Sequence, residues 1–308
     1  MPEVISSIWD DLELLTVEEA IADGEWLADG IVKEIDAPAP YDHFYDTVTA
    51  NADVIGYKLD VAPRRTRKAG YVPEGGEIPV AGITKDDYDG YAKIRKRAIG
   101  LRVHWEEKQD NRRDVVAERL KAQVASQREE NAEEAYETLE AADINTHAVL
   151  TPWNDGGDVA QDLVDMRALI KGAKDVHGRK FKYVPRFIIV NPVVTDSIIT
   201  NETILKYYTG NMADKNPMLN GESDLKIFGN MLVIEDDAVP ETDLWMGSQV
   251  KAGKLAQREE AWSSPFLPED GTDARGGSHQ SFRSNWSHRR GFFVPRPKAV
   301  VKATGVFR

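Results

Sequence analysis

Two segments of alternating apolar residues flank a long polar insertion, and this arrangement limits the fold more than any other feature of the sequence. Residues 55–61 and 99–105 place apolar side chains at every second position, as half-buried strands do. The insertion, residues 62–98, contains the stretch YVPEGGEIPVAG at 71–82, which is too rich in proline, glycine and glutamate to enter a core. We therefore expect the two strands to pair as the base of a hairpin, with a bulge or a bend near Ala98 and a projecting arm. A two-stranded hairpin is marginally stable alone in water, so such an arm needs another surface to lie on.

Charge is distributed unevenly along the 308 residues, whose net charge is −13. Residues 1–60 hold 15 acidic and 2 basic side chains, whereas residues 61–104 hold 10 basic and 5 acidic ones. An acidic lead segment beside a basic arm favours pairing between segments, within one chain or between copies, over binding to nucleic acid. The alternative that both segments are only solvated surface stays open here. The lead segment has short helical signals, with Thr16 and Glu19 spaced as a capping box, and a linker at 36–44. We expect it to be an arm without a core of its own.

The arm and a second basic cluster near the C-terminus supply the candidate residues for contacts between subunits. The candidates are Arg64, Arg65, Arg67, Lys68, Glu74, Gly75, Gly76, Glu77, Arg95, Lys96, Arg97, Arg289 and Arg290. Their charged side chains would pair with opposite charges on a neighbour. His288 stands beside the second cluster, where anion binding and pairing with a neighbour's carboxylates are both open.

A long amphipathic helix is predicted over residues 111–141, with Asn111 as its N-cap. Its apolar stripe consists of Val116, Leu120, Val124, Ala132, Ala135 and Leu139. The stripe is too irregular for a sustained heptad, so we expect the helix to lie along a sheet rather than in a coiled coil.

The region from 148 to 252 has the pattern of an α/β domain. A helix is predicted from Asp158, with Val159, Leu163, Met166, Leu169 and Ile170 as its apolar face. PRFIIVNP predicts a buried strand, VVTDSIIT and ETILKYYTG two short helices, and LKIFGNMLVIEDDAVP two strands. Further strands are predicted in KLAQREEAW, QSFRSNWSHRRGFFV and PKAVVKATGV.

The sequence lacks motifs for catalysis, cofactors and metals. It has no cysteine, which excludes disulfides, thiolate metal sites and a cysteine nucleophile. Its six histidines show no metal-binding spacing, and GSQVKAGK at 247–254 departs from a phosphate-binding loop. Apolar runs such as FIIV at 187–190 are far shorter than the ~20 residues that span a bilayer, and the N-terminus has no secretory signal. We expect no enzyme activity, no cofactor, no metal, no membrane partner and synthesis in the cytoplasm.

The order of the segments resembles that of the major capsid proteins of tailed bacteriophages. The segments are the acidic arm, the hairpin with YVPEGGEIP, the helix after VHWEEKQDN, the α/β domain and the ending RRGFFVPRPKAVVKATGV. The resemblance covers nearly the whole chain. Its most telling pieces are Glu74 with Gly75, the return IRKRAIGLRVHWEE, and the ending in which Pro297, Lys298 and Ala299 lead into a strand and Gly305.

The resemblance implies an α+β fold of the Hong Kong ninety-seven type. Its parts would be an N-terminal arm at 1–53, an extended β-hairpin loop at 54–104, a peripheral domain with a long spine helix at 105–147, an axial α/β domain at 148–252, and peripheral strands with the C-terminus at 253–308. The loop at 211–222 would point toward the capsomer centre, and the loop at 263–280 toward a local threefold contact.

The implied function is that of a structural major capsid protein. It would assemble as hexamers and pentamers into an icosahedral shell that encloses double-stranded DNA without sequence-specific binding. The implied location is the virion capsid, after assembly and procapsid maturation in the host bacterial cytoplasm, with a portal and separate scaffolding or decoration proteins as partners. Because little precedes the hairpin, we expect scaffolding to be separate or absent and this chain not to be cleaved.

Three alternatives stay open. Some members of the family cross-link a hairpin lysine to a neighbour's asparagine; the matching positions are Lys68 or Lys85 with Asn285, without a specific signature. An encapsulin, which shares the fold, would enclose a cargo enzyme instead of DNA. An α/β hydrolase or transferase with an inserted hairpin is the third.

Overall fold

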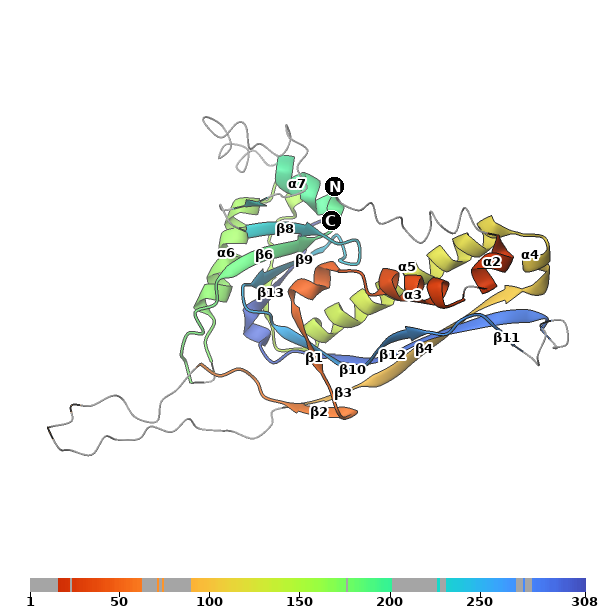
Figure 1. The fold of residues 1–308 in the computed structure, drawn as a ribbon. Coiled ribbons are helices and arrows are strands. Elements are labelled where there is room, and N and C mark those ends of the chain that lie inside the picture. The colour runs from red at the N-terminus through yellow and green to blue at the C-terminus, as the bar shows by residue number, and fades with distance from the viewer. Residues whose placement is uncertain are drawn as a thin grey trace.

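The computed structural model describes residues 16–22, 24–62, 71, 74, 90–175, 177–200, 226–227, 231–269, 274 and 279–308. Figure 1 shows a long sheet with helices along one face, and a second sheet with its own helices at one end of the first. Several sequence predictions lie outside the described residues: Arg64, Arg65, Arg67, Lys68, Gly75, Gly76, Glu77, Lys85, the helix in ETILKYYTG and the loop at 211–222.

The long sheet is built around two strands that the sequence predicts, β10 (Gly253–Ser263) and β12 (Ser281–Phe293). These two strands pair antiparallel, and β1 (Tyr45–Thr49) joins β10 in parallel. On its other side β12 pairs with β4 (Arg95–His104) over ten consecutive residues, and the short β11 (Leu267–Pro268) pairs with β12 on the same side as β10. The sheet therefore joins segments from the first and last thirds of the chain.

The predicted hairpin base is wrong, because the two predicted strands do not pair with each other. β2 (Val54–Tyr57) pairs with β3 (Gly90–Lys93), while residues 99–105 contribute to β4 instead. The chain breaks between β3 and β4 at Ile94, whose amide donates to the Asp53 carbonyl at 2.8 Å. β4 then runs in continuous register with β12, so the expected bulge near Ala98 is absent. β4 pairs with β12 rather than with β2, because β12 provides a longer ladder of backbone hydrogen bonds and a buried apolar face.

The small β2–β3 sheet crosses the far side of the long sheet. Its inward residues Ile55, Tyr57 and Ala92 pack with Phe293 and Ala256. At Gly291 the approach is so close that a Cβ atom would lie 2.8 Å from the Lys93 carbonyl oxygen. Glycine at this position is therefore required by the crossing.

The predicted long helix is α5 (Arg113–Glu140), whose 28 residues extend about 42 Å. The apolar stripe is confirmed, since every predicted residue of the stripe is buried. The helix begins two residues later than predicted, and Asn111 is not its N-cap. Asn111 has φ of 48° and its Oδ1 accepts the Val17 amide at 2.9 Å. A short helix, α4 (Trp105–Gln109), connects β4 to this turn.

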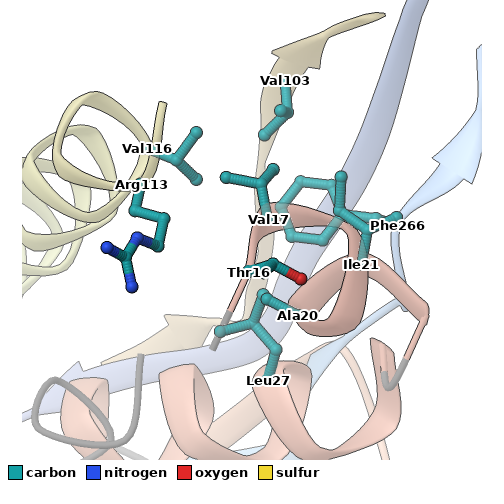
Figure 2. A pocket seen from close by; sticks show the side chains of 9 residues that line it. All are labelled: Thr16, Val17, Ala20, Ile21, Leu27, Val103, Arg113, Val116 and Phe266. Carbon is teal, nitrogen blue, oxygen red and sulfur yellow. The ribbon is translucent and has the colours of Figure 1, made fainter. Parts of the chain in front are cut away.

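The acidic lead segment has no core of its own, as the sequence indicates, but it packs on the body of the chain in a core shared with α5, β4 and β12. It forms α2 (Val17–Ala22), α3 (Gly24–Ile35) and the 3-10 helix η1 (Pro40–His43). The predicted capping box is confirmed, because the Glu19 amide donates to Thr16 Oγ1 at 3.2 Å and the Thr16 amide to Glu19 Oε2 at 2.9 Å. Figure 2 shows apolar side chains of α2 and α3 facing Val103, Val116 and Phe266 around a small cavity. Amphipathic helices next to an apolar groove of the same chain bury more surface by folding onto it than by projecting.

The second sheet has the strand order β5 (Asn145–Ala148), β13 (Val300–Thr304), β9 (Asp243–Ser248), β6 (Pro185–Val190), β8 (Met231–Glu235) and β7 (Lys226–Ile227). The helices α6 (Val159–Gly172) and α7 (Pro192–Thr200) accompany it, with the 3-10 helices η2 (Trp153–Asp155) and η5 (Pro297–Ala299). The helix predicted to start near Asp158 is α6, and Asp158 caps it by accepting the Gln161 amide at 3.1 Å.

Three details of this region differ from the sequence analysis. β9 lies in the middle of the sheet although its residues were not predicted as a strand. β13 lies here rather than with the peripheral strands, because it pairs with β5 and β9. Leu169 of α6 is 37% exposed, whereas the other predicted apolar residues of the helix are fully buried.

Two apolar cores are joined by α5. Its first half packs with α2, α3, β4 and Trp286, and its second half packs with the second sheet and α6. Between the cores, the buried face of α5 carries Gln127 and Asn131 in place of apolar residues. The middle of the helix therefore crosses a polar layer.

Candidate intersubunit surface

One face of the long sheet carries α3 and α5, and the opposite face has no helix over it in Figure 1. We call this second surface, at the end away from β2–β3, the open face. Opposed residues of an antiparallel pair share a face, so the register places Trp262 with Ser287 and Leu267 with Arg283 on it. Its members are Ala98, Gly100, Arg102, Trp262, Leu267, Arg283, Asn285 and Ser287.

The open face displays apolar side chains to solvent. Trp262 is 59% exposed and Leu267 is 57% exposed. Ala98, Gly100 and Ser287 are small, so few side-chain atoms project from this part of the open face. Exposed tryptophan next to arginine is typical of the residues that contribute most to protein interfaces.

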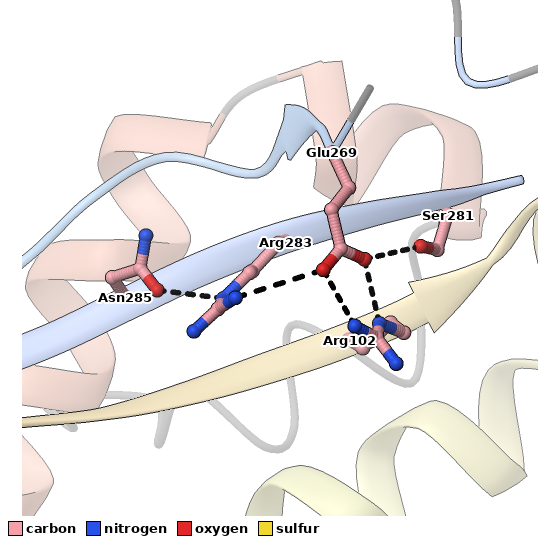
Figure 3. Close-up of polar contacts among 5 residues, drawn as sticks. All are labelled: Arg102, Glu269, Ser281, Arg283 and Asn285. Atoms are coloured by element: carbon pink, nitrogen blue, oxygen red, sulfur yellow. Dashed lines mark hydrogen bonds and ion pairs between the residues drawn. The ribbon is translucent and has the colours of Figure 1, made fainter. Parts of the chain in front are cut away.

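An arginine and carboxylate network orders one end of this face, as Figure 3 shows. Arg102 donates to both carboxylate oxygens of Glu269, at 2.6 and 2.5 Å, and Ser281 Oγ donates to Glu269 at 2.7 Å. Arg283 lies 3.6 Å from Glu269 and donates to Asn285 Oδ1 at 2.8 Å. The hydrogen bonds from Arg102 and Ser281 lower the pKa of Glu269 to about 2, so the carboxylate stays ionised at neutral pH.

The same network fixes the base of the loop that follows β11. The Glu269 amide donates to the Ser281 carbonyl at 2.9 Å, so both ends of the segment between them are tied to β12. Gly100 permits this arrangement, because a Cβ atom there would lie 2.6 Å from Arg283 Nε. The guanidinium groups are thereby presented in a fixed plane.

The two basic clusters predicted from the sequence meet across β4 and β12. Arg95 stands opposite Arg290, Lys96 opposite Arg289, and Arg97 opposite His288. Alternation separates them by face: Arg289 points to the open-face side, and Arg290 points beneath the helices. Glu74 is exposed. The sequence did not show that the two clusters are neighbours in space, because they are almost 200 positions apart.

Several of these basic residues have acidic partners within the chain. Arg97 lies 3.2 Å from Glu134 and Arg289 lies 3.3 Å from Glu259. Arg290 lies 3.7 Å from Asp36 and is only 9% exposed. Arg95 and Lys96 are exposed. These two residues are the members of the clusters most available to another molecule.

His288 is part of the polar layer under α5. It is 2% exposed, and neither ring nitrogen has a hydrogen-bond partner among the described residues. Burial, together with the nearby positive charges of Arg290 and Arg97, lowers its pKa to about 3. The ring is therefore neutral at physiological pH, which removes His288 from the predicted basic patch. The period-two alternation of Trp286, His288, Arg290 and Phe292 was the signal that could have placed it inside.

Within the described part of the chain, no group of three or more histidine, aspartate or glutamate residues is placed to hold a metal ion. His147 lies 3.0 Å from Asp162, which also accepts the Trp153 indole N–H at 2.9 Å. These bonds connect α6 to β5 and η2. No helix among the described residues combines the length and apolar character needed to cross a bilayer.

Comparison with known proteins identifies relatives of this architecture. The family model for "Phage capsid protein" matches residues 88–303. A comparison with curated protein sequences finds no significant match.

Solved structures share the fold at low sequence identity. The capsid of cyanophage P-SCSP1u aligns with a TM-score of 0.60 and 12% identity, over 88% of this chain and 89% of that chain. The virus-like particle from Pyrococcus furiosus aligns with a TM-score of 0.56 and 13% identity, over 91% and 99% of the two chains. The Microbacterium phage Oxtober96 structure aligns with a TM-score of 0.57 and 13% identity, over 87% and 91%. At these identities the likeness concerns the fold.

Proposed function

The chain belongs to the phage capsid protein family and is a structural major capsid protein rather than an enzyme, and we propose that its copies assemble through the open face into a closed icosahedral shell. In this proposal the shell is built from hexamers and pentamers and encloses double-stranded phage DNA. Assembly takes place in the host cytoplasm, with a portal and separate scaffolding or decoration proteins as further partners.

The observation that carries this proposal is the exposure of Trp262 and Leu267 on the same face of the sheet as the ordered network of Arg102 and Glu269. A monomer gains nothing from exposing two large apolar side chains on a flat sheet, whereas a second copy can bury them. The guanidinium plane of Arg102 is held in place by Glu269 before binding, which lowers the entropy lost on contact. Exposed Lys96 on the open-face side, exposed Arg95 on the other face of β4, and the predicted arm residues Arg64, Arg65, Arg67, Lys68, Glu74, Gly75, Gly76 and Glu77 supply further charged contacts in the proposal.

Assembly of Trp262 variants tests the open face. Replacing an aromatic centre of an interface costs on the order of 2 kcal/mol, so Trp262→Ser should lower the yield of shells about tenfold or more. Trp262→Phe, which keeps an aromatic surface, should retain most assembly. The yield is measured by sedimentation and negative-stain microscopy, with circular dichroism to establish that both variants fold. Normal shells from folded Trp262→Ser would exclude the open face as the main contact.

A shell without DNA is the second candidate, because the virus-like particle from Pyrococcus furiosus matches as well as the phage capsids do. Nucleic-acid extraction from particles isolated from their natural source separates the two. Double-stranded DNA supports the viral shell, whereas a protein cargo without DNA supports the nanocompartment. Intact-mass analysis of the same denatured particles tests the proposed cross-link at Asn285, since covalently joined subunits would exceed the 34.4 kDa chain.

A further inference from the structure

A groove lies where the two regions of the molecule meet. α3 and η1 line one side, α5 lines the bottom, and the turn after β8 lines the other side. Its volume is about 680 Å³, a size typical of clefts that hold a ligand or a short peptide. The groove is separate from the open face, because α3 and α5 lie on the other side of the long sheet.

The bottom of the groove is apolar. Ile35, Tyr41, Val124 and Ala132 line it and are almost fully buried. Ala125 also lines it and is exposed at the surface of α5. Ala125 and the half-buried Ala39, Pro40 and Ala238 supply the accessible apolar surface, which can accept an apolar side chain from a binding partner.

The rim of the groove is acidic. The ionised side chains that line it are Glu34, Glu129, Glu235, Asp236 and Asp237, with Lys121 and Arg128 as the basic ones. Asp236 is engaged, since it accepts the Tyr136 hydroxyl at 2.6 Å and the Ala238 amide at 3.0 Å. Glu129, Glu235 and Asp237 are exposed and form no ion pair with the described residues. Within the described part of the chain, the rim therefore has carboxylates that no basic side chain pairs.

We propose that this groove binds a short basic peptide segment of another protein, anchored by an apolar side chain. A nucleic acid is disfavoured because its phosphates would meet the carboxylates of the rim. A purely apolar segment would cover those carboxylates without pairing them, which is costly. Lysine or arginine next to leucine satisfies both surfaces, with charge pairs at the rim and apolar burial below.

The groove is lined from both regions of the molecule, so a bound peptide would touch both. Binding that favours one arrangement of two regions stabilises that arrangement by mass action. A partner that docks here would therefore stabilise the junction of the two regions along α5. The binding does not depend on shell formation, so the two proposals can fail independently.

Fluorescence anisotropy of the purified full-length chain tests the groove. The probe is a short fluorescein-labelled peptide of alternating lysine and leucine, and the two control peptides replace leucine by serine or lysine by glutamate. We expect saturable binding of the first peptide, weakened by salt, and no measurable binding of the glutamate peptide. The serine peptide should bind at least about tenfold more weakly, because it lacks the apolar anchor.

Two sets of variants locate the binding. The triple variant Glu129→Gln, Glu235→Gln and Asp237→Asn should bind the peptide about tenfold more weakly, as the loss of three exposed charge pairs predicts. Ala125→Trp should weaken it similarly by filling the groove while keeping the charge. The matched control, Glu118→Gln, Glu133→Gln and Glu241→Gln, removes three exposed acidic groups outside the groove and should bind normally. Equal losses in both triple variants, equal binding of the serine peptide, or no binding of the lysine and leucine peptide would each overturn the proposal.

Discussion

At the scale of single residues, burial and register decide which basic side chains serve the surface. Arg289 and Arg290 are neighbours in sequence, yet one faces the open-face side and the other lies beneath the helices at 9% exposure. Whether a residue stands at an odd or an even position of the strand therefore decides which face its side chain occupies, and the residue type alone does not. The same parity places neutral His288 inside.

His288 should make the protein sensitive to acid. The folded side chain has a pKa lowered to about 3, whereas an unfolded histidine titrates near ~6.5. Between these values the unfolded chain binds the proton and the folded chain does not, so stability falls as pH is lowered. We expect this side chain to add a slope of up to about 1.4 kcal/mol per pH unit to the free energy of unfolding.

Urea unfolding of unassembled protein from pH 7 to pH 4 measures this slope. His288→Gln should remove the contribution, and His104→Gln, at an exposed position, should leave the slope close to that of the original chain. An unchanged slope in His288→Gln would show that the ring is already accessible to protons.

At the scale of elements, α5 organises the molecule because it contributes to both apolar cores. Its stripe was readable from the sequence, since apolar residues recur at helical spacing. The docking of α2 and α3 was not readable, because a short amphipathic helix gives no sign of which groove accepts it. The strand partners of residues 55–61 and 99–105 were mispredicted for a similar reason. Alternation identifies a strand but not its neighbour.

The docked lead segment gives a prediction for Leu27 of α3. Leu27 is 1% exposed and packs in the core with Val116 and Leu120. Leu27→Ala should lower the free energy of unfolding of the unassembled chain by about 2–5 kcal/mol through lost burial and a residual cavity. Asp29→Ala, on the exposed side of the same helix, should change it by less than ~0.5 kcal/mol. If both variants unfold alike, α3 is not packed on its own chain in solution.

At the scale of the whole molecule, the chain separates a self-contained body from surfaces that suit contact with other copies. The body has its cores and a continuous long sheet, while the open face exposes Trp262 and Leu267. The β2–β3 sheet decides where the predicted arm can be removed without loss of strands from the body. Removal of 62–98 would also delete β3 and the first part of β4, so a cleaner deletion spans 63–89.

Deletion of 63–89, with a short glycine and serine linker from Ala62 to Gly90, should leave β2 paired with β3 and the body folded. We expect thermal unfolding of the deleted chain to resemble that of the full chain, and we expect no closed shells by negative-stain microscopy, because the arm is the part proposed to bridge subunits. The control is the full chain with the same glycine and serine linker inserted after Ala62. Shells of normal size from the deleted chain would contradict a bridging arm.

The amino-acid sequence was enough to predict the α5 helix, the start of the α6 helix, most strands and the resemblance to phage capsid proteins, which the family match confirms. The helices and strands follow from local periodicity and from the residue types that end them. The folded chain was needed to show that β4 pairs with β12, that β9 and β13 complete the second sheet, and that α2 and α3 pack on the body. Such choices depend on long-range competition for the same apolar surface and backbone hydrogen bonds, and local sequence patterns do not encode the outcome.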